Sequence, residues 1–149
     1  MPGEKPIAEN RKARFDYQFL ERLEAGLVLT GSEVKSLREG RVSLAQAYAD
    51  VRDGEVWLVG AEIATYDQGN IANHVPTRDR KLLLHRGEIS SLYGKVREKG
   101  LTLVPTRLYF SGGRAKVEIA LARGKDVGDK RQAIKEREMK REMERSIRR

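Results

Sequence analysis

The chain contains no cysteine, so it has no disulfide bonds, no thiolate metal ligands and no cysteine nucleophile. A protein without disulfides suits a reducing compartment. Long apolar runs are also missing, because no stretch approaches the roughly 20 residues that a membrane-spanning helix needs. Residues 1–14 are polar and charged, and they lack the apolar segment of a secretory signal. These absences predict a cytoplasmic protein.

Residues that commonly carry catalysis are sparse as well. The two histidines, His74 and His85, are eleven residues apart and lack metal-ligand spacing. Ser90-Ser91 and Ser111 lie in no nucleophile-elbow motif. Gly112-Gly113 lacks the Lys and Ser or Thr that complete a phosphate-binding loop. The sequence therefore predicts a protein that is not an enzyme and has neither a metal nor another cofactor.

Positive charge, in contrast, is abundant. The 149 residues include 30 Lys or Arg and 22 Asp or Glu, for a net charge of +8. Such an excess favours a polyanionic partner, because cations that neutralise phosphates release condensed counterions. The alternative is a soluble protein that is basic without binding nucleic acid. The chain is long enough for one domain with a core, and its 39% hydrophobic content indicates that some residues lie outside that core.

Two hairpins are predicted from turn residues that separate apolar arms. Asp53-Gly54 divides residues 46–59, and Asp-Gly readily takes the two positive φ angles of a tight type I′ turn. The second hairpin has arms at 101–110 and 114–122, joined by Ser111-Gly112-Gly113. Its last arm alternates apolar residues with a second set that includes Lys116, Glu118 and Ala120, so one face is expected to point to a core.

Two helices are predicted from capping signals. Thr30-Gly31-Ser32-Glu33 has the spacing of a capping box, and Gly40 ends the short helix that follows. Residues 86–99 have helical periodicity, and Gly100 stands where a C-terminal cap belongs. The apolar positions of this second helix, all expected to face the core, are Ile89, Leu92, Tyr93 and Val96.

Shorter patterns assign the remaining segments. Residues 1–14 are predicted to form a flexible arm. Aromatic and polar residues alternate over 15–19, which predicts a strand, and residues 27–29 predict a second strand. Residues 61–66 are expected to extend the sheet, and a polar loop is expected from 67 to about 77.

These elements predict a mainly β fold with short helices, an α+β class, with about six strands and two or three helices. Sequential hairpins with one buried face must hide their edges, and a small antiparallel barrel does so. An open sheet with helices on one face is the alternative. Residues 1–123 are expected to form a β-barrel domain with an N-terminal arm.

Residues 124–149 are predicted to be a separate basic tail. They contain ten Lys or Arg and six Asp or Glu, and nearly every residue from Gln132 onward favours a helix. Asp129 is a plausible N-cap, but Met139, Met143 and Ile147 form too thin an apolar stripe to bury much area. The tail is therefore expected to be disordered when free and helical when an anionic partner holds it.

Two basic clusters in the predicted domain favour RNA over a merely solvated charged surface. One is Asn10–Arg14, and the other is Pro76–Arg86, in which Arg78 and Arg80 alternate beside an apolar Leu run. Arginine offers a planar fork to phosphates and stacks on bases. Aromatic residues are few, at 6%, and form no exposed row for base stacking. The expected mode is therefore recognition of RNA shape and backbone.

Several motifs occur in the order typical of one family. They are Asn10-Arg11-Lys12-Ala13-Arg14, Glu24-Ala25-Gly26, Gly31-Ser32-Glu33-Val34-Lys35-Ser36-Leu37-Arg38, Arg78 with Arg80-Lys81-Leu82-Leu83-Leu84-His85, and Asp129-Lys130-Arg131. From about residue 7 to the tail the chain resembles SmpB, the SsrA-binding protein family of bacterial trans-translation. The resemblance implies an oligonucleotide-binding-type barrel. It also implies an adaptor, here expected as a monomer, that binds the tRNA-like part of tmRNA and delivers it to stalled ribosomes.

The resemblance also implies which residues contact each RNA. Seven tmRNA-binding residues follow from it, namely Asn10, Arg11, Glu24, Lys35, Lys81, Leu83 and His85. The neighbouring cations add Arg14, Arg38, Arg78 and Arg80. Since Glu24 is an anion, it is expected to accept from a base amino group or a ribose hydroxyl.

In the family the tail lies near the decoding centre of the small ribosomal subunit and becomes helical along the mRNA channel. The residues implied here are Asp129, Lys130, Arg131, Lys135, Arg137, Met139, Lys140, Arg141 and Ile147. Gly128 and Met139 stand where the family often has residues that stack on RNA, so charge and backbone contacts are expected to replace stacking. Two other functions remain open: a structural protein that permanently coats ribosomal RNA, and an enzyme that acts on RNA.

Overall fold

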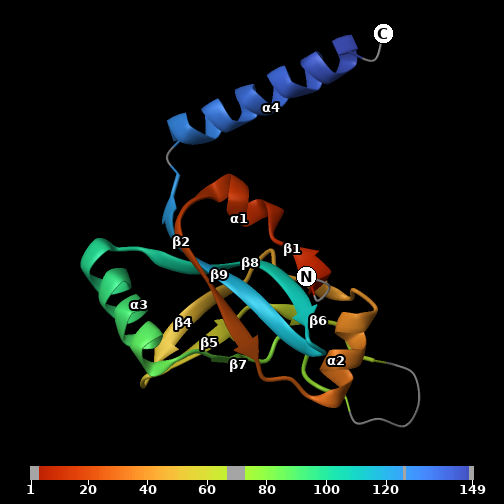
Figure 1. The fold of residues 1–149 in the computed structure, drawn as a ribbon, viewed down its shortest axis with the longest axis vertical. Coiled ribbons are helices and arrows are strands. Elements are labelled where there is room, and N and C mark those ends of the chain that lie inside the picture. Colours follow the sequence, from red (N-terminus) through yellow and green to blue (C-terminus); the bar gives the residue numbers. More distant parts are fainter. Residues whose placement is uncertain (1–3, 67–72, 126, 148–149) are drawn as a thin grey trace.

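The computed structural model describes residues 4–66, 73–125 and 127–147, which form nine strands and four helices (Figure 1). The strands are β1 (Glu4–Glu9), β2 (Tyr17–Leu27), β3 (Val42–Ser43), β4 (Tyr48–Arg52), β5 (Glu55–Val59), β6 (Glu62–Ile63), β7 (Arg80–Leu83), β8 (Thr102–Ser111) and β9 (Arg114–Gly124). The helices are α1 (Arg11–Asp16), α2 (Gly31–Arg38), α3 (Arg86–Lys99) and α4 (Val127–Ile147).

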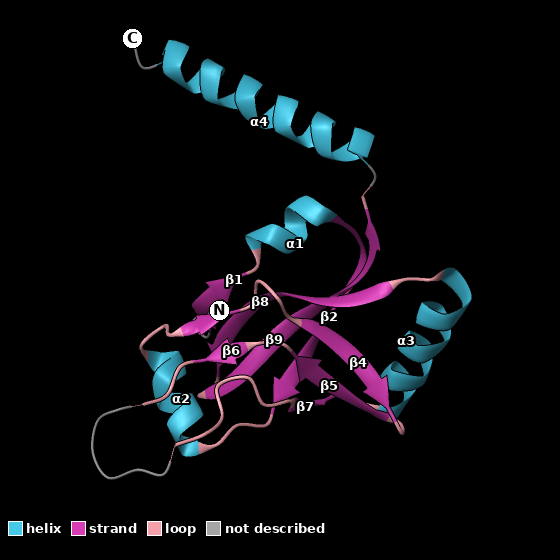
Figure 2. Cartoon of the chain, turned by 180° about the vertical axis from the view of Figure 1, so that it is seen from behind, coloured by secondary structure: helices cyan, strands magenta, loops and turns pink. Residues whose placement is uncertain are grey.

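Six antiparallel strands close into a ring, which confirms the predicted barrel. The main sheet has the order β1-β8-β4-β5-β7-β2-β9, and pairing of β8 with β9 closes it. The ring is uneven, because β4 joins β8 only at Ala49 and Leu103, whereas β2 and β9 pair over most of their length. Helices α2 and α3 lie at opposite sides of the barrel (Figure 2).

Both predicted hairpins are confirmed, and their turns have the expected backbone geometry. Asp53 and Gly54 have φ angles of 51° and 76° between β4 and β5. Gly112 and Gly113 have φ angles of 59° and 77° between β8 and β9. Because few residues other than glycine adopt positive φ without strain, these turns set the register of both hairpins.

The capping signals also predicted both helices correctly. Thr30 and Glu33 form the reciprocal capping box of α2. Helix α3 spans the predicted residues, and Gly100 caps it with a φ angle of 61°. Leu92 is buried, but Tyr93 is 45% exposed, so the prediction that it faces the core is wrong. Tyr93 instead accepts a hydrogen bond from Arg97 one turn later, on the outer face of the helix.

The N-terminal segment differs most from its prediction. Instead of a flexible arm, residues 4–16 form β1, which pairs with β8, followed by the short helix α1, and residues 1–3 of the predicted arm lie outside the described residues. Phe15 ends up in α1, and β2 is one strand of 11 residues rather than two strands. A register shift between Phe19 and Glu21 interrupts the alternation of β2. Strand β1 forms because β8 supplies partners for its backbone from about 100 residues away, which local composition cannot reveal.

Residues 61–66 contribute less to the sheet than predicted. Only Glu62 and Ile63 are in a strand, β6, which pairs with β3 in a separate two-stranded ribbon. Ile63 and Ala61 are buried, so this segment still adds to the core. Part of the predicted loop at 67–77 lies outside the described residues.

The barrel core contains the inward face of β9, as its alternation predicted. Val117 and Ile119 are completely buried. The opposite face is covered as well, because Ala120 and Ala122 pack with Ala13 of α1 in a second, smaller cluster. Helix α1 therefore covers part of the outer surface of the sheet.

Residues 127–147 of the predicted tail form α4, which extends away from the barrel beyond α1 (Figure 1). Asp129 lies inside α4 and not at its N-cap, because the helix already begins at Val127. The guanidinium carbon of Arg137 lies 5.7 Å from the centre of the Phe15 ring, whereas the side chains described over 134–145 are exposed. The disorder of the free tail and the division at residue 124 stay predictions.

Candidate nucleic-acid interface

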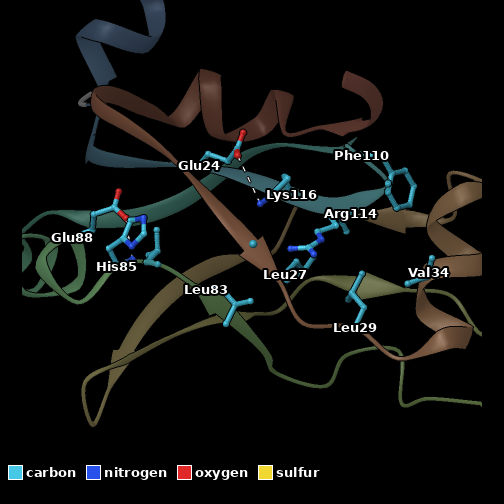
Figure 3. A pocket seen from close by; sticks show the side chains of 14 residues that line it. Glu24, Leu27, Leu29, Val34, Leu83, His85, Glu88, Phe110, Arg114 and Lys116 are labelled. Carbon is cyan, nitrogen blue, oxygen red and sulfur yellow. Dashed lines mark hydrogen bonds and ion pairs between the residues drawn. The ribbon is translucent and has the colours of Figure 1, made fainter. Parts of the chain in front are cut away.

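A groove of about 600 Å³ runs between β2, the β7–α3 junction and the β8–β9 hairpin. We call it the Glu24 groove, and it is lined by Glu24, Gly26, Leu27, Leu29, Val34, Leu83, Leu84, His85, Glu88, Phe110, Gly113, Arg114, Ala115 and Lys116. Figure 3 shows His85 and Glu88 at one side, and Phe110 and Arg114 toward Val34 of α2. Glu24 of β2 thus lies in the same groove as Leu83 and His85, which belong to a different sequence motif.

Glu24 is held in place by a buried tyrosine. The hydroxyl of Tyr109 donates to Oε2 of Glu24, and Tyr109 is only 2% exposed. Burial raises the pKa of Tyr109, and the hydrogen bond to Glu24 adds to the rise, so the phenol stays a protonated donor. The other oxygen, Oε1, is 4.0 Å from Nζ of Lys116. This fixed carboxylate can accept from a base amino group or a ribose hydroxyl.

The apolar side of the groove depends on close contact between two strands. Gly26 of β2 lies opposite Leu83 of β7. A Cβ atom at position 26 would lie 3.3 Å from Cβ of Leu83, tighter than usual packing allows. Glycine therefore leaves room for Leu83, which is 54% exposed. An apolar surface of this kind can contact a base or a ribose while the cations around it hold phosphates.

Sequence reasoning missed the cations of the β8–β9 hairpin. Lys116 and Arg114 both line the Glu24 groove, and Arg114 has no ion pair with any described residue. The sequence did contain a signal for Lys116, because the alternating pattern of β9 places this residue on the face that points away from the core. Phe110 was also missed, since its apolar side chain suggested only packing.

Other predicted residues lie outside this groove. Nζ of Lys81 forms an ion pair with Glu55 at 3.1 Å, although its side chain is 41% exposed. Lys35 lies over the Tyr66 ring at 5.5 Å. Arg11 and Arg14 are exposed on α1, where Arg14 lies 4.0 Å from Glu9. The interface predicted from sequence is therefore spread over several faces, and only part of it converges on one groove.

Two predicted RNA contacts need correction, because their side chains lie inside the fold. Asn10 is 3% exposed, and its Nδ2 donates to the carbonyls of Leu44 and Pro105 at 3.1 and 2.9 Å. Arg80 is completely buried and donates to the Ala61 and Pro76 carbonyls. These side chains support the surface from inside without reaching it, since their donors already have partners within the protein.

A buried ion-pair network fixes the second basic cluster to α2. Glu33 is fully buried and accepts from Nε of Arg80 at 2.5 Å and from Nη2 of Arg78 at 2.5 Å. Burial raises the pKa of Glu33, but hydrogen bonds from the two arginines and the Thr30 amide outweigh it and hold the pKa below its ordinary value. Arg78 thus forms an ion pair with Glu33, while 32% of its side chain is exposed.

The tail residues implied by the resemblance divide into two groups. Lys135, Arg137, Met139, Lys140 and Arg141 are exposed on α4. The side chains of Asp129, Lys130, Arg131 and Ile147 lie outside the described ones. None of the helices described is long and apolar enough to cross a membrane. Over the same described residues, no group of three or more His, Asp or Glu is placed to hold a metal ion.

Comparisons with known proteins agree with this architecture. The SsrA-binding protein of Thermobifida fusca is 61% identical over 147 residues, which cover 99% of this chain and 92% of that protein. The SsrA-binding protein of Symbiobacterium thermophilum is 59% identical, with 97% and 92% covered. A chain in a solved structure described as "tmRNA-SmpB: a journey to the center of the bacterial ribosome" is 50% identical with a TM-score of 0.70. That similarity covers 87% of this chain and 95% of the other. Since residues 7–149 also match the SmpB protein family, the chain belongs to that family.

Proposed function

We propose that this chain is an RNA-binding adaptor that holds the tRNA-like part of tmRNA and carries it to stalled ribosomes in the bacterial cytoplasm. The observation that carries the proposal is the Glu24 groove, where an anchored carboxylate, an exposed leucine and two cations face one cavity. The two relatives named above are SsrA-binding proteins, and the description of the similar solved structure names tmRNA-SmpB and the bacterial ribosome. In this proposal the adaptor binds RNA and does not catalyse a reaction.

Within this proposal the residues take different roles. Glu24, Leu83, His85, Arg114 and Lys116 contact RNA directly. Lys35, Lys81, Arg11 and Arg14 supply exposed positive charge at the margins of the same RNA. Asn10 and Arg80 position the surface from inside, and Arg78 does so in part through Glu33.

Replacing the two polar groups of the Glu24 groove tests the proposal. Glu24→Ala and Lys116→Ala are each expected to weaken binding of the tRNA-like fragment of tmRNA roughly 10- to 100-fold, the range for a lost charged hydrogen bond. Lys116→Ala is also expected to make the slope of log affinity against log salt less steep by roughly 0.7 to 0.9. Electrophoretic mobility shifts at several salt concentrations measure both quantities.

Glu62→Gln is the matched control, because Glu62 is exposed on β6 and does not line the Glu24 groove. Its affinity for the fragment should equal that of the unchanged protein. Equal affinity for Glu24→Ala as well would contradict the assignment of the groove.

A permanent ribosomal RNA-coating protein is the second candidate function. The net charge of +8 and the exposed cations of α4 are compatible with it. An anchored acceptor such as Glu24 favours a specific RNA instead, because a carboxylate repels phosphates and adds nothing to unspecific coating.

A further inference from the structure

A second groove, of about 550 Å³, lies on the other side of the β8–β9 turn. We call it the Arg38 groove, and it is lined by Lys5, Pro6, Ile7, Leu37, Arg38, Gly40, Phe110 and Gly113. Phe110 and Gly113 line both grooves, so the two cavities meet at the end of the hairpin. Strand β1, α2 and the hairpin form this groove together.

The charge of the Arg38 groove is of one sign. Its lining contains two cations, Lys5 and Arg38, and no carboxylate. Both side chains are exposed, and neither has an ion pair or side-chain hydrogen bond with a residue that the structure describes. The Glu24 groove differs, because two carboxylates and two basic side chains share it with His85.

The carboxylates nearest in sequence are turned to other arginines. Glu4, beside Lys5, forms an ion pair with Arg107 at 2.9 Å. The hydrogen bond from Arg107 lowers the pKa of Glu4, so Glu4 is an anion at neutral pH and faces Arg107. Glu39, beside Arg38, lies 4.0 Å from Arg41. The two groove cations are therefore left without a local counterion, and the groove presents concentrated positive charge.

The apolar and glycine residues suit an RNA strand as well. Ile7 and Phe110 are partly exposed and offer apolar surface to riboses or bases in the same groove as the two cations. Gly112 and Gly113 have no side chains to block a backbone that crosses the turn from one groove to the other. A strand held by Lys116 and Arg114 thus has an open path to Arg38 and Lys5.

We propose that the two grooves form one continuous track, in which Lys5 of β1 and Arg38 of α2 bind a second phosphate segment of the same tRNA-like RNA. The inference rests on the proposed function and extends it to a site that includes the N-terminal strand. Pairing of β1 with β8 then contributes directly to RNA binding, because it places Lys5 at the groove.

Alanine substitutions in the full-length chain test the track with the tRNA-like fragment of tmRNA as the probe. Lys5→Ala and Arg38→Ala are each expected to lower affinity several-fold, and the double variant roughly tenfold or more at 0.15 M salt. Each substitution should also make the salt slope less steep by roughly 0.7 to 0.9. Lys5→Arg and Arg38→Lys keep the charge and should keep the slope.

Arg97→Ala is the control, because it removes one positive charge from α3, away from both grooves. It should leave affinity and slope nearly unchanged, and the thermal unfolding midpoint of every variant should match that of the unchanged protein. The inference is overturned if the double variant binds the fragment with unchanged affinity and slope, or if only binding to purified ribosomes weakens. Failure of the unchanged protein to bind the fragment would instead overturn the proposed function, and the inference with it.

Discussion

Removing residues 126–149 is expected to leave affinity for the tRNA-like fragment nearly unchanged and to abolish the tagging of proteins on stalled ribosomes. The truncation keeps β9 and Lys125, whose amide donates to the Asp16 carbonyl at 2.8 Å, so the barrel keeps its strands and α1 loses only its contacts with α4, such as Arg137 over Phe15. It removes α4, whose side chains described over 134–145 are exposed. The exposed cations of this helix are available to a second RNA.

Two assays separate these effects. Mobility shifts with the fragment measure RNA affinity, and a reconstituted translation reaction with a stalled ribosome measures tagging. Glu24→Ala is the complementary control, because it should weaken fragment binding while α4 is intact. If the truncated chain lost as much RNA affinity as the combined Glu24→Ala and Lys81→Ala variant, the assignment of a separate role to the tail would be wrong.

Glu33→Ala is expected to destabilise the fold by about 3–5 kcal/mol, the usual cost of removing one partner from a buried ion pair. The substitution leaves Arg80 completely buried without its anion and removes the hydrogen bond to the Thr30 amide. Urea unfolding at pH 7 measures the change in free energy. Glu39→Ala, at the exposed end of α2, should cost far less.

The same network predicts a pH dependence of stability. Because the folded-state pKa of Glu33 is held below its ordinary value of 4.5, ionised Glu33 stabilises the folded state at pH values above 4.5. That contribution should be lost as the pH falls from 4.5 through the lowered pKa. Urea midpoints between pH 7 and pH 3 should therefore drop less steeply in Glu33→Ala than in the unchanged protein. Parallel curves would contradict the ion-pair account.

Much of the barrel could be predicted because its signals are local. The glycine turns at 53–54 and 111–113, the capping box at 30–33 and the cap at Gly100 each depend on neighbouring residues. Strand β1 could not be predicted in this way, because it forms only by pairing with β8. Strand β2 was divided in error, since the register shift after Phe19 breaks its alternation.

Candidate site residues could be predicted where a sequence motif contains them. They could not be predicted where burial determines whether a side chain reaches the surface. Glu24 lines the same groove as Leu83 and His85, which lie far from it in the sequence, and the RNA contacts of all three stay predictions. Arg80 belongs to the same basic cluster as Lys81, but the first is buried and the second half-exposed. Charge and spacing in the sequence do not show which cation forms an ion pair with a buried carboxylate such as Glu33.

Sequencing the RNA that co-purifies with the full-length protein from bacterial cells tests the central claim most directly. The account predicts one dominant species with a tRNA-like end, tmRNA, and its loss from the Glu24→Ala, Lys116→Ala double variant. Recovery of bulk ribosomal RNA in place of that species, unchanged in the double variant, would contradict it.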